Sequence, residues 1–249
     1  MNKKKLPIVL AGVATGLLLL SATGSTRAAL SYISDNYIAQ VDIKSIGVTL
    51  TENGQDISWR DYTHKDDAWN EGQGVLLENL LTNAGDEEIV LNKVYPEELA
   101  VRNSGTIDEY VRVVVTKYWL DSDGVTKRTD LDPAIIDLHF TNNGWVEDET
   151  AATSERNVFY YTNILPSGET APAFADTIKI GDELAKKVTE TTKTENGCTT
   201  IETSYVYDGV VFVLRADVDA VQTHNAEDAI MSAWGVDVNI SGDGSLSLN

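Results

Sequence analysis

The chain has 249 residues, 42% of them hydrophobic, which is enough apolar material for a core and excludes wholesale disorder. Its 39 acidic residues against 19 basic ones give a net charge of −20. That balance argues against nucleic-acid binding, which needs clustered Lys and Arg to neutralise phosphates. One Cys cannot close an intramolecular disulfide, and three scattered His make a His-built catalytic metal site difficult to assemble.

The N-terminus indicates an export signal. Three lysines, Lys3 to Lys5, precede the 15 uncharged residues Leu6 to Leu20, a stretch shorter than the roughly 20 residues of a membrane span. Small residues at Thr26 and Ala28 predict cleavage between Ala28 and Ala29, with an uncleaved N-terminal anchor as the alternative. Removal of residues 1–28 leaves 15 basic against 39 acidic residues, a net charge of −24. We expect a secreted protein with no stable membrane insertion after cleavage.

The region that follows is rich in strand-like segments. Val111–Leu120 is the strongest, and the Asp121–Gly124 turn predicts that Val125–Thr129 returns beside it. Further strands are expected at Leu99–Arg102 and Val158–Thr162, and two more hairpins join Ile135–Phe140 to Trp145–Val146 and Thr199–Tyr207 to Val210–Val218. Turns at this spacing favour an all-β sandwich or barrel formed as one domain, residues 44–249.

Two short segments have helical character. Asn225–Trp234 places small and apolar residues at helical spacing ahead of Gly235, and Ile180–Val188 is a weaker candidate. Ala151–Arg156 and Thr189–Gly197 are polar and are expected to be loops. The sequence therefore predicts one or two short helices beside the sheets.

Few residues suggest catalysis. His64, His139 and His224 lack the i, i+4 spacing of a zinc protease, and His64 is expected in a solvated loop. No Gly-x-Ser-x-Gly elbow occurs, and no carboxylate pair is singled out for glycoside hydrolysis. Arg112 is expected to be structural and to face solvent or a carboxylate. We predict no catalytic residue and no enzyme.

Acidic residues at alternate positions raise the question of calcium. The pairs are Asp121/Asp123, Asp130/Asp132 and Asp217/Asp219. Because Ca²⁺ takes six to eight oxygen ligands, one pair supplies too few, and an ordinary turn at residues 121–124 is the favoured interpretation. We predict no resident metal and no cofactor, with weak Ca²⁺ binding at subunit contacts as the alternative. Cys198 is expected to be a buried small hydrophobe, or else a link between two chains.

Several stretches resemble a known family. Residues 24–31, GSTRAALS, resemble the Gly-x-Thr-x-Ala-x-Phe-Ser/Asn-Asp signature of proteins exported through the ER-type signal peptidase of Gram-positive bacteria, with Leu30 in place of Phe and the Asp delayed to Asp35. Three more resemble the TasA/camelysin group: Val101–Gly105 with Tyr110–Val113, Ile164–Thr170, and Asp219–Gln222 ahead of Ala233–Gly235. The matches are short, occur in the expected order and span most of the chain.

The resemblance implies a jelly-roll or Ig-like β-sandwich that is cut by signal peptidase and assembles with copies of itself into fibres of the extracellular (biofilm-type) matrix. In such fibres the new N-terminal segment completes a sheet of the next subunit. Carried onto this sequence, the donor segment is residues 29–43, whose apolar anchors are Leu30, Ile33, Tyr37, Val41 and Ile43. Alternatively, the segment is the first strand of its own domain.

The leading hypothesis is thus a secreted, non-enzymatic fibre subunit that polymerises head to tail by donating residues 29–43. A monomeric cell-surface Ig-like binding or adhesion module is the alternative. A metalloprotease, the activity described for camelysin-type relatives, is a third and weaker reading, because the histidines lack the ligand spacing.

Overall fold

The computed structural model divides the chain into two units, Met1–Ile43 and Lys44–Asn249. It describes residues 45–249 except 66–67, 187, 196–197 and 206–208, and no side chains between 186 and 208. The predicted signal peptide, the cleavage site and the donor segment 29–43 therefore lie outside the described residues, as does the side chain of Cys198. None of the helices in the described part is both long and apolar enough to cross a membrane.

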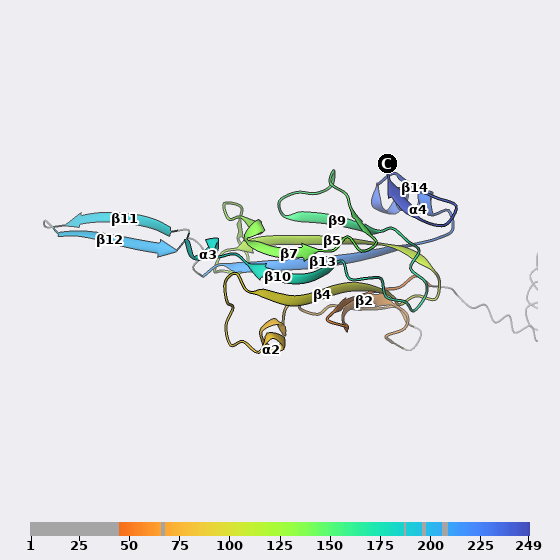
Figure 1. Cartoon of the computed structure of the whole chain (residues 1–249), viewed down its shortest axis with the longest axis horizontal. Coiled ribbons are helices and arrows are strands. Elements are labelled where there is room, and N and C mark those ends of the chain that lie inside the picture. Colours follow the sequence, from red (N-terminus) through yellow and green to blue (C-terminus); the bar gives the residue numbers. More distant parts are fainter. Residues whose placement is uncertain (1–44, 66–67, 187, 196–197, 206–208) are drawn as a thin grey trace, which may run out of the picture. The chain divides into compact units, whose positions relative to one another are not determined.

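One layer of the fold is a six-stranded antiparallel sheet (Figure 1). Its strand order is β3-β2-β1-β4-β10-β7, so chain neighbours alternate with strands from distant parts of the sequence. The strands are β1 (Val48–Glu52), β2 (Gln55–Asp61), β3 (Asn70–Gly72), β4 (Val94–Asn103), β7 (Ile136–Phe140) and β10 (Ala175–Ile180).

The second layer is a five-stranded sheet in the order β13-β5-β9-β8, with the short β6 pairing with the end of β5. Its strands are β5 (Glu109–Leu120), β6 (Lys127–Arg128), β8 (Trp145–Glu147), β9 (Arg156–Tyr161) and β13 (Val211–Gln222). The strand predicted at Val111–Leu120 is confirmed as β5, which has partners on both sides. A long β-branched run is typical of such a central strand.

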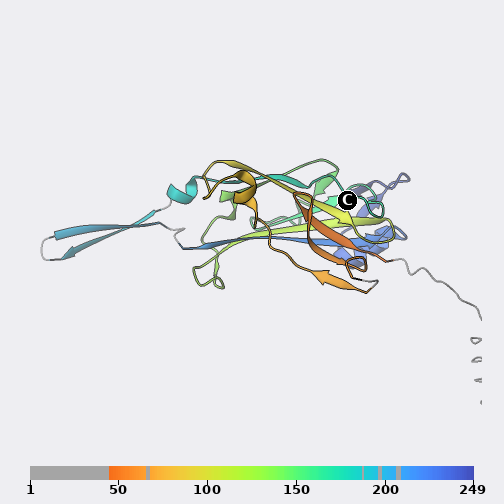
Figure 2. The same ribbon diagram turned by 90° about the horizontal axis from the view of Figure 1, so that it is seen from below.

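The two sheets face each other across one hydrophobic core (Figures 1 and 2). Leu99 and Val101 of β4 and Val111, Val113 and Val115 of β5 are all fully buried in it. Side chains alternate along a strand, so each sheet sends every second residue into this layer. The predicted all-β sandwich is confirmed.

A second apolar cluster covers the outer face of the five-stranded sheet. Helix α4 (Ala226–Trp234) packs with the hairpin of β14 (Val238–Ile240) and β15 (Leu246–Leu248) against outward-facing residues of β5 and β9. The helix predicted at Asn225–Trp234 is thus confirmed. It ends where predicted, since Gly235 has a φ of 71° and donates to the Met231 carbonyl.

Truncation of Ile230 tests this second cluster. Ile230 is fully buried, so Ile230→Ala is expected to lower the free energy of unfolding by about 2–5 kcal/mol through lost burial and a residual cavity. Urea unfolding monitored by circular dichroism measures the change. Met231→Ala is the control, because Met231 is 46% exposed. Equal losses in both variants would show that the cluster does not stabilise the domain.

Two predicted hairpins are wrong in their pairing. The strands β7 and β8 exist, but β7 pairs with β10 in one sheet and β8 pairs with β9 in the other. Likewise, β13 pairs with β5, whereas β12 (Cys198–Tyr205) pairs with β11 (Val188–Glu195). The turns between the strands carry the chain from one sheet to another, which local turn residues do not specify.

Three local assignments also differ. Residues 189–197, expected to be a loop, largely form β11, and Ile180–Val188 contains only the short helix α3 (Glu183–Lys186). A further helix, α2 (Leu80–Ala84), was not predicted, nor was the 3₁₀ turn Pro133–Ile135. The described region therefore has three α-helices instead of one or two. The ribbon of β11 and β12 pairs within itself (Figure 1), so its strands need no apolar alternation toward a core.

Candidate functional site

The long strand β13 is an open edge of its sheet. Among the described residues it pairs with β5 alone, over all twelve of its positions. Alternate N–H and C=O groups of an edge strand point away from its only partner and are free to pair with another strand. The edge spans roughly 40 Å at about 3.3 Å per residue. The fold therefore offers a long template for strand addition.

The inner face of β13 is incompletely covered. Phe212, Leu214 and Ala216 pack against the main core yet remain partly exposed. Across the ladder, Val115 and Trp119 of β5 pair with Ala216 and Phe212 and are only 0% and 4% exposed. The core is thus closed under β5 and open under β13, and a strand placed beside β13 would bury apolar surface as well as pair its backbone.

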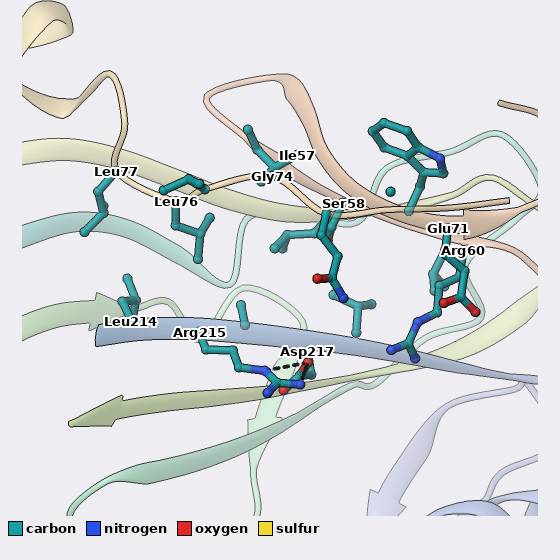
Figure 3. A pocket seen from close by; sticks show the side chains of 18 of the residues that line it. Ile57, Ser58, Arg60, Glu71, Gly74, Leu76, Leu77, Leu214, Arg215 and Asp217 are labelled. Atoms are coloured by element: carbon teal, nitrogen blue, oxygen red, sulfur yellow. Dashed lines mark hydrogen bonds and ion pairs between the residues drawn. The ribbon is translucent and has the colours of Figure 1, made fainter. Parts of the chain in front are cut away.

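A groove of about 620 Å³ follows this open edge (Figure 3). We call it the β13 groove. Its floor and walls are β13, the facing parts of β1 and β2, and the strap, which we define as residues 73–79 between β3 and α2. The lining residues are Val48, Leu50, 57–60, 71–77 and 212–218.

The two ends of the β13 groove differ in character (Figure 3). At one end, Leu76 and Leu77 of the strap lie opposite Leu214. Toward the other end lie charged side chains, including Arg60 and Glu71, which are cross-strand partners on β2 and β3. An occupant of this groove needs apolar side chains on one face and tolerates charge at one end.

Two glycines bring the strap and β3 close to β2. A β-carbon at Gly72 would lie 2.3 Å from the Trp59 ring, and one at Gly74 would lie 2.6 Å from the Ile57 carbonyl oxygen. Because no side chain fits there, the glycines permit the close approach that forms the wall of the groove.

At the end of the groove lies the stem, residues 45–47, through which the N-terminal segment joins β1. The Gly47 carbonyl accepts hydrogen bonds from the amides of Ser104 and Gly105, at 2.8 and 3.0 Å. Ser45 and Thr106 exchange two more bonds. A β-carbon on Gly105 would lie 2.6 Å from the Gly47 nitrogen, so the two segments pack backbone against backbone. The stem is firmly attached to the β4–β5 connection.

Asn103 joins two of the family-like stretches. Its side-chain amide donates to the carbonyls of Ile107 and Leu165, at 2.8 and 2.9 Å, and its Oδ1 accepts from the Gly105 amide at 2.9 Å. Its backbone also exchanges bonds with Glu169 and Gly168. The stretches 101–105 and 164–170, far apart in sequence, therefore lie together beside the stem.

Asp219, in the third of the stretches that the sequence singles out, also lies near the stem. Arg112 donates to Asp219 Oδ2 at 2.5 and 3.2 Å and lies over the Trp234 ring at 5.2 Å. Of the two environments expected for Arg112, solvent or a carboxylate, the structure shows the carboxylate. These residues line a second hollow of about 350 Å³ together with Gly47 and Val218, so it adjoins the end of the β13 groove. The side-chain amide of Gln222 donates to the nearby His224 carbonyl at 3.3 Å.

A buried carboxyl group lies under the stem. Glu109 is fully buried, and its Oε2 accepts from the Gly47 amide at 3.4 Å while its Oε1 has no partner among the described groups. Burial raises the pKa of Glu109 to about 8, although the Gly47 hydrogen bond opposes the shift. The group is therefore largely protonated at neutral pH, which reduces the cost of burying it.

His64 lies in an exposed turn, as expected from the sequence, but its ring is held in place by neighbouring side chains. Its Nδ1 lies 2.8 Å from Asp61 and its Nε2 lies 3.1 Å from Asp56, and the ring stacks on Trp59. Burial would raise the pKa of Asp61, but hydrogen bonds from Ser104, His64 and Thr63 together lower it. Both ring nitrogens face carboxylates, so neither is placed to activate a nucleophile.

The predicted acidic pairs have local partners. Asp123 accepts from the amides of Val125 and Thr126, which makes residues 121–126 an ordinary turn. Arg128 binds Asp130, and Asp132 accepts from the Ala134 amide at the start of the 3₁₀ turn. Arg215 binds Asp217. Within the described part of the chain, no three His, Cys, Asp or Glu side chains gather in a way that could hold a metal ion.

Among these features, the β13 groove and the stem are the candidate functional site. Sequence patterns gave no sign of the groove, because β13 lies more than 130 residues along the chain from the other lining segments. Comparison with protein-family models, with characterised proteins and with solved structures finds no match of any kind.

Proposed function

We propose that this protein is a secreted, non-enzymatic structural subunit of an extracellular fibre, in which residues 29–43 of one copy occupy the β13 groove of the next. The observation that carries the proposal is a twelve-residue edge without a second strand partner among the described residues, combined with a partly exposed apolar inner face. Strand addition satisfies both at once, by pairing backbone groups and burying apolar side chains.

The donor segment has a matching pattern. Ile33, Tyr37, Val41 and Ile43 are separated by even numbers of residues, so an extended strand places all four on one face. Polar residues such as Gln40 and Asp42 then fall on the other face. Fifteen residues extend over roughly 50 Å, enough to follow the whole of β13. The segment could therefore fill the groove with its apolar face inward.

The clamped stem favours exchange between copies. It is held in place by the bonds of Gly47 and Ser45, so the N-terminal segment starts from a fixed point at the end of the groove. The stem leads directly into β1, which lines the groove at Val48 and Leu50, so a segment that filled the groove of its own chain would have to run back along the strand that follows it. Entry into a second copy needs no reversal, and such a head-to-tail contact repeats without closing.

A complementation experiment tests the proposal. The chain from Ala29 carrying Ala216→Arg keeps the donor but has a cation in its groove, whereas a chain from Lys44 keeps the groove but lacks the donor. We expect neither to form fibres alone, and the two together to form a one-to-one complex in light scattering. The unaltered chain from Ala29 is expected to form fibres visible by electron microscopy.

Val125→Arg is the matched control, because it adds the same charge at a residue that is 80% exposed and does not line the groove. It should polymerise normally. Each variant is first checked for folding by circular dichroism. Because a net charge of −24 opposes subunit contact, the samples are compared at about 0.15 M and 0.5 M salt, where screening differs. Absence of the mixed complex at both would refute strand exchange, and a monodisperse monomer would favour the binding-module alternative.

A further inference from the structure

Two buried glutamates meet at the far end of the sandwich. Glu52 at the end of β1 and Glu97 of β4 are 6% and 1% exposed, and both side chains point into the layer between the sheets. Glu97 Oε2 accepts from the Asn53 amide at 3.2 Å, but Oε1 has no donor. A proton on Glu97 that bonds to Glu52 satisfies this oxygen, because the protonated group then donates instead of accepting.

Glu52 in turn holds the strap. Its Oε1 accepts from the Leu77 amide at 2.6 Å, and the Leu77 φ is +66°, an unfavourable conformation for a bulky residue. Leu77 and its neighbour Leu76 form the apolar wall of the β13 groove. The carboxylate of Glu52 thus helps to fix the backbone that positions this wall.

The described residues around Glu52 and Glu97 are acidic, neutral or already ion-paired, so they supply little positive charge to balance two carboxylates. Glu98 and Glu78 are exposed neighbours on β4 and the strap, and both add negative charge. The hollow of about 420 Å³ beside Glu52 is lined by neutral residues: Asn53, Gln55, Ile57, Asn79, Asn83 and Pro96. The base just before β4, Lys93, is ion-paired with Asp86.

Burial, followed by the contact with Glu52, raises the pKa of Glu97 to about 8. Two adjacent carboxylates cannot both ionise cheaply in a dry site. Glu52 lines the neighbouring hollow whereas Glu97 does not, so the proton of Glu97 exchanges with solvent by way of Glu52 when the strap moves.

We propose that a proton shared by Glu52 and Glu97 is a latch that holds the strap in place and thereby sets the wall of the β13 groove. This regulation rests on the proposed function only for the identity of the occupant. Opening the strap breaks the Leu77–Glu52 hydrogen bond and admits water to Glu52 and through it to Glu97, whose pKa then returns toward its ordinary value. The latched form consequently binds one more proton than the open form between pH 4.5 and about 8, and rising pH across that window favours opening.

Hydrogen–deuterium exchange of the chain from Ala29, at a concentration where light scattering shows monomers, tests the latch. After correction for intrinsic exchange, protection of peptides covering 72–84 is expected to fall by up to about tenfold per pH unit between pH 5 and 8 and to level off above pH 8. Glu97→Gln, which keeps the shape and carries no titrating proton, should abolish this dependence. Glu52→Gln is the second variant in case the first does not fold.

Glu98→Gln is the control, because it makes the same substitution one residue away at an exposed position. Its strap should behave as in the unaltered chain. A peptide covering 238–248, in the outer cluster, should show no fall of this kind in any variant. Strap protection that is independent of pH in the unaltered chain, or that falls equally in Glu97→Gln and Glu52→Gln, overturns the proposal.

The two proposals fail separately. Because exchange is measured on monomers, a pH-dependent strap in a protein that never polymerises leaves the latch intact and removes the fibre. If the protein forms fibres but the protection of its strap does not depend on pH, the fibre proposal stands and the latch is refuted.

Discussion

Replacing Asn103 by Ala is expected to cost about 3 kcal/mol or more of unfolding free energy. The side chain is fully buried and makes three hydrogen bonds, to Ile107, Leu165 and Gly105. Each such bond contributes about 1 kcal/mol, and its loss also leaves buried backbone groups unpaired, which costs more. The change removes the connection between the 101–105 and 164–170 stretches, so the stem should loosen as well.

Urea unfolding followed by tryptophan fluorescence measures this loss, with Asn142→Ala as the control. Asn142 lies in an exposed turn, and its replacement should change stability by less than about 0.5 kcal/mol. Exchange of the amides in 45–47 should rise in the Asn103 variant and stay unchanged in the control. A loss below 1 kcal/mol for Asn103→Ala would mean that the neighbouring backbone finds other partners.

Replacing Glu109 by Gln is expected to remove a large part of the pH dependence of stability. The folded chain holds a proton on Glu109 up to about pH 8, whereas the unfolded chain releases it near 4.5. Between those values the folded state binds more protons, so the free energy of unfolding falls as pH rises, and it levels off above about 8. Each pH unit in this window is worth up to about 1.4 kcal/mol, so the full effect amounts to several kcal/mol.

The measurement is a series of urea unfolding curves from pH 5 to 9. The unaltered chain should lose stability toward pH 8 more steeply than Glu109→Gln, whose amide keeps an acceptor for the Gly47 N–H and has no proton to lose. Glu149→Gln, at an exposed position, should follow the unaltered chain. Parallel curves for all three would show that Glu109 is ionised in the folded protein at neutral pH. Glu97 titrates over the same window, so the Glu109 variant retains a residual slope.

Both predictions concern the surroundings of the stem, which links the sandwich to the segment proposed to polymerise. Loss of Asn103 weakens the contacts of the β4–β5 connection, and ionisation of Glu109 places an unpaired charge beneath Gly47. Comparing the two variants in the complementation experiment would show whether a rigid stem is needed for exchange. We expect a loosened stem to weaken the complex formed with the groove of a second copy.

Several parts of the fold could be predicted from local sequence. The run Val111–Leu120 is apolar and β-branched because β5 is paired on both sides and contributes to cores on both faces. Helix α4 has apolar residues at helical spacing and a glycine at the one position after it that requires a positive φ. In each case the signal lies within about a dozen residues, and the structure depends on that same stretch.

Strand pairing could not be predicted in this way. The turn residues at 142–144 predict that the chain reverses direction and forms a hairpin, but β7 and β8 belong to different sheets. A turn fixes a change of direction, whereas the partner of a strand is set by which distant segment buries its apolar face. The polar sequence of residues 189–197 predicts a loop because it has no core-facing alternation, which a two-stranded ribbon does not need.

The candidate site was even harder to predict from the sequence. Glu97 and Glu109 are two of 39 acidic residues, and only the register of β4 and β5 makes them buried. His64 sits among charged residues, and only folding places its ring between Asp56 and Asp61.

By itself, the sequence determined the all-β class, the central strand and the terminal helix, because those follow from short-range periodicity and backbone preference. The tertiary structure alone decided that β13 is an open edge among the described strands, that a groove runs beside it, and that Glu52, Glu97 and Glu109 are buried. These features depend on contacts between residues far apart in the chain, whose energies no local pattern records.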